Sequence, residues 1–351
     1  MKTLNLEKYG LPPDLRGEGD SVPARITAVH RERYELVSEL GPTFGKLKPS
    51  IYFTGGSEDF PTTGDFVLIN YNPRGESQIV KTAPRKSFFS RRDPDKGRGE
   101  QTIAANFDYV FIMQSLNQDF NPKRLERYVT LAWQSGAIPV VILTKADLME
   151  DCSEQLAAAE SVAFGVDIHV VSALDGTGLD ALTTYLQPGN TVVFLGSSGV
   201  GKSSLVNALA GQDIMAVADI REDDAKGRHT TTHRQLVMLD NGAMIIDTPG
   251  LRELGMWDVS VGLGEAFADV ECYFTECKFF DCQHDTEPGC AIKAALQSGE
   301  LSSERWQSYL HLKREAKFTE NKEAYLKMRQ QRFKDICKWN KQRKKHGRAL
   351  E

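Results

Sequence analysis

The sequence TVVFLGSSGVGKSS at residues 191–204 decides the fold of this chain of 351 residues. Its apolar, β-branched first part predicts a buried strand, and the pattern from Lys202 onward predicts a helix. The glycines and the GxxxxGKS spacing between them are typical of a phosphate loop, in which backbone amides and a helix amino end bind an anion. The predicted nucleotide contacts are Gly196, Ser197, Ser198, Gly199, Val200, Gly201, Lys202, Ser203 and Ser204. We expect Lys202 to reach the outer phosphates as a catalytic residue and Ser203 to bind Mg²⁺.

The base is expected to be selected by TKAD at 144–147, which follows an apolar run and so lies at the carboxyl end of a strand, where α/β sheets bind ligands. The Asp147 carboxylate can accept two hydrogen bonds from N1–H and the exocyclic amine of guanine, and adenine lacks this pair of donors. Lys145 would lie along the base plane. The backbone of Ser172 and Ala173, in VSAL at 171–174, would meet the guanine carbonyl. These residues predict GTP and GDP as ligands.

Thr144, also expected at the nucleotide, stands where Asn is commoner in this motif. The Asn amide normally ties the base-reading loop to the phosphate loop, and the hydroxyl of Thr is shorter. We therefore expect this difference to affect nucleotide affinity more than the choice of base.

Two further segments are candidates for the switches that sense the third phosphate of GTP: GRHTTTH at 227–233 and DTPG at 247–250. Thr230 and Thr231 are expected at the nucleotide, with Thr231 as the Mg²⁺ ligand in our assignment. Asp247 is expected to hold the same ion through water. Without DTPG downstream, the threonine run would be typical of a mobile polar loop.

The residue after DTPG is Leu251, at a position where many GTPases carry the glutamine that orients the attacking water. A leucine cannot orient water, so we expect hydrolysis to be slow in isolation. The missing group would come from His229 or from a partner, and such a group is worth a factor of roughly 10³ to 10⁵. The Gly250 amide, facing the third phosphate, completes the predicted catalytic set with Lys202. A solvated loop imidazole is the alternative for His229.

The order of these motifs is unusual. TKAD and VSAL precede the phosphate loop, whereas the phosphate loop comes first in an ordinary guanine-nucleotide-binding domain. The alternation of strands and helices begins with a strand expected at 107–113 and a helix expected at 122–134. The same parts are thus circularly permuted, so that DTPG lies at the carboxyl end of the domain and leads directly into the next segment.

A cluster of potential metal ligands follows. Cys277, Cys282, His284 and Cys290 form C-x4-C-x-H-x5-C, a set that matches one tetrahedral structural Zn²⁺. The ion would hold together a segment with too little apolar content to fold alone. Buried thiols or disulfides are the alternatives, but with no signal peptide we expect a cytosolic chain, where disulfides are rare. Cys272 is a spare thiol that could compete for the ion.

The amino-terminal part predicts a small β-barrel. Strand-like runs at 24–29, 34–37, 50–54 and 65–70 are separated by turns rich in Gly, Pro and Asp. An OB-like barrel that binds nucleic acid and an SH3-like barrel fit this spacing about equally. PRKSFFSRR at 84–92 interleaves cations with aromatics, and this predicts a basic linker that either contacts RNA or is a solvated connector.

Charge is distributed unevenly along the chain. The net charge is -5, but residues 313–348 contain 14 Lys or Arg and only 4 Asp or Glu, a local balance of +10. Such a segment is suited to a phosphate backbone, with Tyr325, Phe333 and Trp339 available to stack on bases, and a solvated helical face is the alternative. No segment has the apolar length of a membrane span.

Together these residues closely resemble the circularly permuted GTPases known as RsgA or YjeQ, bacterial factors for late assembly of the small ribosomal subunit. The resemblance covers nearly the whole chain and rests on the permuted order joined to GRHTTT and the Cys-Cys-His-Cys set. It implies a cytoplasmic, monomeric GTPase that binds 16S rRNA of the small (30S) subunit and is stimulated by that subunit. It also implies a catalytic role for the histidine at position 229.

The expected architecture is multi-domain. An OB-fold-like β-barrel at 1–85 and a basic linker at 86–104 precede a circularly permuted α/β P-loop GTPase domain at 105–255 and an α-helical, zinc-binding and basic domain at 256–351.

Two other functions stay open on the residues alone. The chain could be a P-loop ATPase or kinase, for which ATP would compete with GTP. It could also be a non-enzymatic zinc-containing RNA-binding protein with a structural nucleotide, although intact Lys202, Ser203 and Asp247 argue against this.

Overall fold

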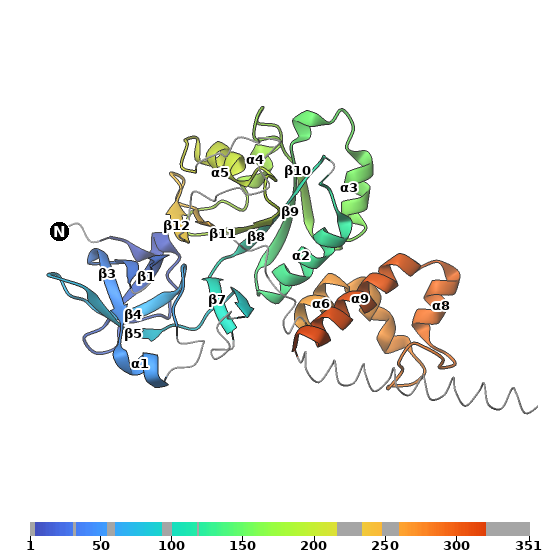
Figure 1. The fold of residues 1–351 in the computed structure, drawn as a ribbon, viewed down its shortest axis with the longest axis horizontal. Coiled ribbons are helices and arrows are strands. Elements are labelled where there is room, and N and C mark those ends of the chain that lie inside the picture. Colours follow the sequence, from blue (N-terminus) through green and yellow to red (C-terminus); the bar gives the residue numbers. More distant parts are fainter. Residues whose placement is uncertain are drawn as a thin grey trace, which may run out of the picture. The chain divides into compact units, whose positions relative to one another are not determined.

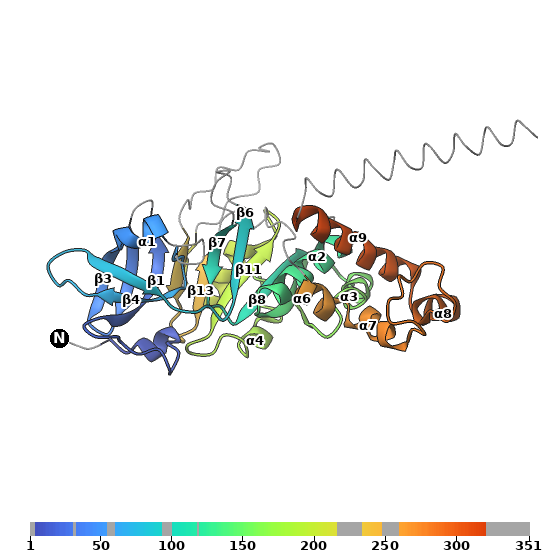
Figure 2. The ribbon, with the colours of Figure 1, turned by 90° about the horizontal axis from the view of Figure 1, so that it is seen from below.

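The computed structural model describes residues 4–30, 33–54, 60–92, 100–117, 119–215, 234–247 and 260–320 (Figures 1 and 2). The chain divides into two compact units, Met1–Leu254 and Gly255–Glu351. The first unit holds a β-barrel and an α/β sheet, and the second is helical.

The barrel has five strands in the closed order β1-β2-β3-β5-β4, with β4 pairing back onto β1. The strands are β1 (Val22–Val29), β2 (Tyr34–Ser38), β3 (Gly41–Leu47), β4 (Phe66–Asn70) and β5 (Ser77–Thr82). A short helix, α1 (Pro49–Thr54), connects β3 to β4. Alternate residues of the strands, such as Ile26, Leu36 and Ile69, fill the interior. The OB-like alternative is therefore the one the structure adopts.

One predicted barrel strand is wrong. Residues 50–54, expected to be a strand, belong to helix α1. Pro49 is the first residue of this helix, a position where its fixed φ and missing N–H are tolerated. The β-branched and aromatic side chains that follow Pro49 give only a weak preference for a strand. The position of this segment in the connection from β3 to β4 outweighs that preference.

The second sheet region is the nucleotide fold. Its strands are β8 (Tyr109–Ser115), β9 (Ile138–Thr144), β10 (Asp167–Val170), β11 (Thr191–Gly196), β12 (Gln235–Met238) and β13 (Met244–Asp247). Their order is β10-β9-β8-β11-β13-β12, parallel except for β12. The phosphate-loop strand β11 therefore lies in the middle of the sheet, although it comes late in the sequence.

Helices cover both faces of this sheet. The helices are α2 (Pro122–Gln134), α3 (Ser153–Glu160), α4 (Leu179–Leu182) and α5 (Lys202–Ala210), with a 3₁₀ turn η3 (Ala146–Leu148) after β9. Leu182 of α4 and Leu205 of α5 pack in one core cluster with Phe111, Val140 and Phe194 from the strands. Helix α2 contacts β8 and β9 and packs against α3. Since strand side chains alternate, the intervening residues of β8 and β9 are available to α2.

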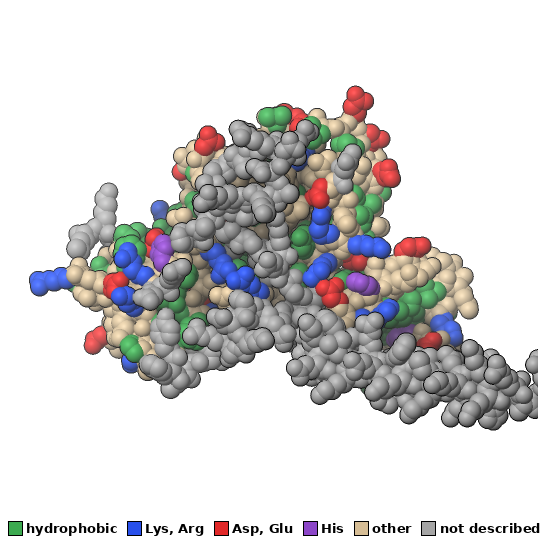
Figure 3. Space-filling view, in the orientation of Figure 1, with side chains coloured by type: hydrophobic (Ala, Val, Ile, Leu, Met, Phe, Trp, Pro, Cys, Tyr) green, Lys and Arg blue, Asp and Glu red, His purple; other side chains and the backbone are tan. Residues whose placement is uncertain are grey.

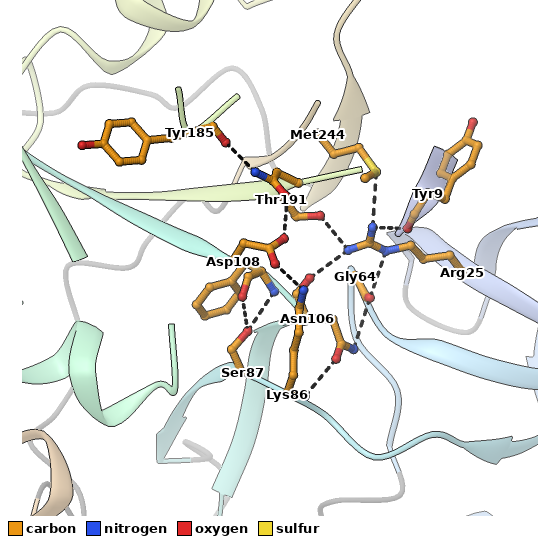
Figure 4. Close-up of polar contacts among 12 residues, drawn as sticks. Tyr9, Arg25, Gly64, Lys86, Ser87, Asn106, Asp108, Tyr185, Thr191 and Met244 are labelled. Carbon is orange, nitrogen blue, oxygen red and sulfur yellow. Dashed lines mark hydrogen bonds and ion pairs between the residues drawn. The ribbon is translucent and has the colours of Figure 1, made fainter. Parts of the chain in front are cut away.

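Arg25 of β1 connects the barrel with the nucleotide sheet (Figure 4). Arg25 is 1% exposed, and its guanidinium donates to the carbonyls of Gly64 (3.2 Å) and Asn106 (2.9 Å) and to Thr191 Oγ1 (3.0 Å). Burial lowers the pKa of Arg25 to about 10, against the opposing charges of Asp108 and Asp65. Thr191 is the first residue of the phosphate-loop strand, so one buried side chain fixes where that strand begins relative to β1.

The segment expected to be a linker contains a strand pair. Strands β6 (Phe88–Arg92) and β7 (Glu100–Ala105) pair antiparallel. Phe89 is buried and stacks on Phe107 at 5.0 Å, and Arg85 forms a 2.8 Å ion pair with the buried Asp65. These two side chains, which the sequence offered to RNA, instead hold the strand pair against the rest of the unit.

The second unit is built from helices α6 (Ser260–Ala266), α7 (Ala268–Glu271), α8 (Ala291–Ser298) and α9 (Ser303–Glu320), with a 3₁₀ turn η5 (Cys272–Glu276). Helix α9 packs against α6 and α7, and α8 against η5. Arg305 of α9 pairs with Asp269 at 2.8 Å and lies 4.0 Å over the ring of buried Phe267. In the described parts of the chain, the helices are too short or too polar to cross a membrane.

Candidate nucleotide-binding and metal sites

The predicted nucleotide residues gather at one edge of the parallel sheet. The phosphate loop leaves the end of β11, Thr144 ends β9, and Asp247 ends β13. Ser172 lies just beyond β10. Because the carboxyl ends of parallel strands meet at the same edge, segments that are far apart in the sequence form one site, as is usual in open α/β sheets.

The backbone of the phosphate loop needs its glycines. Gly199 (φ 71°) and Gly201 (φ 97°) lie in the left-handed region that other residues rarely adopt. A Cβ at Gly196 would lie 3.0 Å from the Met113 carbonyl oxygen of the neighbouring strand. Gly201 caps α5 without a side-chain hydrogen bond, so the first amides of α5 remain available to an anion. The loop can therefore cradle phosphates with its backbone.

Lys202 and Asp247 face each other across this loop. Lys202 Nζ donates to Asp247 Oδ1 at 3.0 Å, and both side chains are largely buried. Ser203 follows Lys202 on the first turn of α5. A cation for the phosphates, a carboxylate and a hydroxyl thus lie together, and the two oxygen groups are of the kind that Mg²⁺ prefers. The residues present fit a phosphate-bound Mg²⁺.

Thr144 does tie the base-reading loop to the phosphate loop. Its hydroxyl donates to the Val200 carbonyl oxygen at 2.7 Å, and Val200 itself is buried. The Thr144 side chain therefore connects the two loops, although it is shorter than the asparagine that is commoner at this position. Lys145, the next residue, has a left-handed backbone (φ 63°) that turns the chain sharply into η3.

The side chain of Ser172 has a role that the sequence did not indicate. Ser172 Oγ donates to Asp147 Oδ1 at 2.7 Å and accepts from the Leu174 amide at 3.2 Å. Ser172 is fully buried. The hydroxyl thereby fixes the orientation of the carboxylate expected to bind guanine, while Ala173 packs against the sheet core.

Asp119, in the connection from β8 to α2, was not singled out in the sequence. Its Oδ2 accepts from Ser197 Oγ of the phosphate loop at 2.6 Å, and Arg124 contacts the same oxygen at 2.9 Å. Burial raises the pKa of Asp119, but the hydrogen bonds from Ser197 and Arg124 and the charge of Lys145 outweigh it and leave the pKa below its ordinary value. The available signal was a polar run directly after a buried strand.

Four predicted site residues lie outside the described residues. These are His229, Thr230, Thr231 and Gly250.

The metal-ligand cluster predicted from the sequence is assembled in the second unit. The ligand atoms of Cys277, Cys282, His284 and Cys290 all lie within 4.8 Å of one another. His284 Nδ1 is 3.5 Å from the sulfurs of both Cys277 and Cys290. Three thiols and an imidazole at this spacing fit one tetrahedral ion. Desolvation and hydrogen bonds from Cys290 and Cys277 raise the pKa of the Cys282 thiol to about 11, an effect that a bound cation would reverse.

Aromatic side chains enclose the histidine of this cluster. Phe274 stacks on the His284 ring at 4.5 Å, and Trp306 meets it edge-on at 5.9 Å. Cys272 is exposed, bonds to the Asp269 carbonyl oxygen, and lies outside the cluster. The spare thiol therefore does not share the site in this arrangement.

Comparison with known proteins identifies the family. The family model described as RsgA GTPase matches residues 82–257. The protein named small ribosomal subunit biogenesis GTPase RsgA 1 of Listeria monocytogenes is 46% identical over 330 residues, which are 93% of this chain and 94% of the relative. The chain belongs to the RsgA family of GTPases. Like the other RsgA proteins it hydrolyses GTP, which decides against the kinase, ATPase and non-enzymatic alternatives.

Solved structures show the same fold. The crystal structure of YjeQ from Thermotoga maritima aligns with a TM-score of 0.62 at 25% identity and covers 83% of this chain and 97% of that one. YloQ, described as a circularly permuted GTPase, aligns with a TM-score of 0.60 at 24% identity, covering 87% of this chain and 99% of that one. A second family model, described as 50S ribosome-binding GTPase, matches residues 191–334. That match begins at β11 and leaves out TKAD and VSAL, in line with a permuted order.

Replacing Asp147 with Asn should change base selectivity. An amide accepts one hydrogen bond where the carboxylate accepts two, and its NH₂ group can instead donate to the 2-oxo group of xanthine. We expect Asp147→Asn to weaken GTP binding by about 10- to 150-fold, the effect of losing one good bidentate contact, and to improve binding of XTP. Fluorescent-nucleotide titration measures both. Asp151→Asn, an exposed carboxylate beyond the base loop, is the matched control, and unchanged GTP affinity in Asp147→Asn would contradict the assignment.

Proposed function

We propose that this GTPase acts in late maturation of the small (30S) ribosomal subunit, where it binds 16S rRNA and hydrolyses GTP to GDP and phosphate with stimulation by the subunit. The observation that carries the proposal is similarity over most of the chain to proteins named small ribosomal subunit biogenesis GTPase. The relative from Listeria monocytogenes is 46% identical over 93% of the chain, and the one from Methanosarcina acetivorans is 45% identical over 79%. The assembled nucleotide edge supplies the chemistry that this role needs. We place the protein in the cytoplasm, acting as a monomer.

In the proposed reaction, water attacks the γ-phosphorus of GTP, the bond to the bridging oxygen breaks, and GDP leaves with that electron pair. Asp147, oriented by Ser172, holds guanine, and the amides of the phosphate loop hold the phosphates. Lys202 stabilises charge on the outer phosphates, together with the Gly250 amide. Ser203 and Thr231 would hold Mg²⁺, which would neutralise phosphate charge. We assign His229 to the attacking water.

The barrel offers a surface suited to single-stranded RNA. Arg33 lies 3.7 Å over the ring of Phe44, which is partly exposed on β3. Exposed Lys46, which pairs with Glu76 at 2.8 Å, lies on the same strand, and exposed Lys48 follows just after the strand ends. Stacked aromatic and guanidinium groups beside cations bind bases and phosphates without much sequence preference. Several Lys and Arg side chains are visible over the barrel in Figure 3. We assign rRNA contact to this surface and to the basic segment 313–348.

The permuted order suggests how the nucleotide state reaches the second unit. DTPG begins at Asp247, the last residue of β13, and in the sequence residues 251–259 lie between it and helix α6. Ordering of DTPG by the third phosphate would act on the chain that enters the helical unit. GTP would then favour the state that binds RNA, and GDP would favour dissociation of the protein from the RNA. In this unit we propose Zn²⁺ as the structural ion.

Co-sedimentation with purified ribosomal subunits tests the proposal. We expect the protein to bind small subunits about fivefold to tenfold more tightly with a non-hydrolysable GTP analogue than with GDP. A difference of this size is typical of the coupling between two binding sites. Large subunits are the necessary control, because one matching family model is described as 50S ribosome-binding. Equal binding to both subunits, or no difference between the two nucleotides, would refute the role.

A further inference from the structure

The loop between the first two metal ligands carries an unusual pair of side chains. Phe280 is 108% exposed, the largest value among the exposed large hydrophobic residues in the described part of the chain, and its neighbour Phe279 is 41% exposed. Residues 278–281, which we call the Phe280 loop, lie between Cys277 and Cys282. The core of this unit is formed by other residues, among them Phe267, Val270 and Ile292. Phe280 therefore adds nothing to folding through burial.

The backbone around the Phe280 loop is held by several contacts. The Lys278 amide donates to the Gly289 carbonyl oxygen at 3.1 Å, and the Cys282 amide donates to the Phe279 carbonyl oxygen at 3.3 Å. Gly289 approaches so closely that a Cβ there would lie 3.0 Å from Lys278 Cβ. Both ends of the loop are also potential metal ligands. A fixed loop pays little ordering entropy on binding, so an aromatic at its tip is a ready anchor.

Single exposed apolar residues are normal, but two adjacent aromatics on a fixed tip have the composition of an interface centre. Phe280 could enter an apolar protein pocket or stack on an unpaired base. The charge around it distinguishes these two kinds of partner.

The sequence around the Phe280 loop is acidic. Residues 276–287 contain Glu276, Asp281, Asp285 and Glu287 against the single cation Lys278. Glu287 is turned toward backbone amides, including that of Gln283, but the other three carboxylates are on exposed residues. An ion of charge +2 held by three thiolates would add a further net negative charge. A phosphate backbone is repelled by such a surface, whereas a basic protein is attracted to it.

We infer that the Phe280 loop is a docking surface for a basic protein, with Phe280 entering an apolar pocket and Glu276, Asp281 and Asp285 facing cations around it. The inference rests on the proposed function, because it takes the partner to be a protein component of the small ribosomal subunit. RNA contact is thereby assigned to the barrel and the basic segment, and protein contact to the metal-stabilised loop.

A photo-crosslinker at the loop tip identifies what it touches. Full-length protein carrying the substitution Phe280→p-benzoylphenylalanine is bound to small subunits with a GTP analogue, irradiated, and digested for mass spectrometry. We expect crosslinks to a basic subunit protein. Crosslinks to 16S rRNA, or to residues 321–351 of the same chain, would overturn the inference.

Two substitutions give an independent test. For one of them, Asp281→Lys, the expected change in binding affinity has opposite signs for a basic protein and for RNA. Phe280→Ser should weaken small-subunit binding by about tenfold or more, as expected for an interface anchor, while Phe164→Ser, an exposed phenylalanine of the first unit, should not. Asp281→Lys should weaken binding to a basic protein but strengthen binding to RNA. Metal content of each variant shows that the site is intact.

The outcomes separate the inference from the proposed function. If the unmodified protein fails to bind small subunits, the proposed function fails. If it binds and Phe280→Ser binds equally well, or if Asp281→Lys binds more tightly, the docking surface is wrong and the subunit role stands.

Discussion

GTP turnover should rise by roughly 10³- to 10⁵-fold when purified small ribosomal subunits are added, the range found when a missing transition-state group is supplied by a partner. The physical reason is Leu251, which follows DTPG and cannot orient the attacking water. In the isolated protein we expect Lys202 and the backbone amides to hold the phosphates, while the leucine at position 251 leaves the nucleophile to be positioned by another group. Phosphate release from GTP and from ATP, with and without subunits at one fixed salt concentration, measures the effect.

Variants locate the origin of this stimulation. If His229 is moved to the water by docking, His229→Ala should retain the basal rate and lose most of the stimulated rate. His233→Ala, the second histidine of the same segment, is the matched control and should behave as the unmodified protein. Lys202→Met should lose both rates, because the phosphate charge is then uncompensated. Turnover that is already fast without subunits would refute the ribosome-triggered mechanism, and ATP turnover at the same level would refute the reading of Asp147.

The elements beside the motifs were predictable because local signals agree there. Helix α2 covers Pro122–Gln134, as expected from its sequence. Asn121 caps it by accepting from the Arg124 amide, and Pro122 occupies the first turn. The strand preceding the phosphate loop is likewise defined by its own apolar run. In both places the turn chemistry and the hydrophobic pattern specify the same boundary.

Where structure depends on distant partners, the sequence was a poorer guide. Strand β3 contains Gly41, Pro42 and Gly45, and it exists because β2 and β5 pair with its two sides. No local pattern in it indicates a strand. The strand predicted at 50–54 was wrong for the same reason: its local pattern favours a strand, but its position in the fold makes it part of helix α1.

The residues of the candidate site divide in the same way, into those that a local motif predicts and those that depend on distant partners. Asp147 and Lys202 could be predicted as site residues because their motifs specify the chemistry. The hydrogen bonds that Ser172 donates to Asp147 and Ser197 donates to Asp119 join residues 25 and 78 positions apart. Such pairs are created by the convergence of strand ends, which spacing along the chain does not reveal.

Removing one metal ligand should unfold the segment 272–290. Zinc binding contributes about 10 to 16 kcal/mol in small zinc-finger peptides, and this segment has few buried apolar side chains of its own. In Cys282→Ser we expect loss of the ion, rapid proteolysis within 272–290 and weaker small-subunit binding, while GTP binding by the first unit is retained. Metal analysis, limited proteolysis and nucleotide titration measure these three properties.

Cys272→Ser is the matched control, because this thiol is exposed and lies outside the ligand cluster. It should keep one equivalent of metal and full protease resistance. The ion should also be lost on acidification, since protons compete for the three thiolates and the His284 imidazole that it requires. If Cys272→Ser loses the ion while Cys282→Ser keeps it, the ligand set is wrong. If both variants stay folded without metal, the aromatic packing of Phe274 and Trp306 around His284 must stabilise the segment by itself.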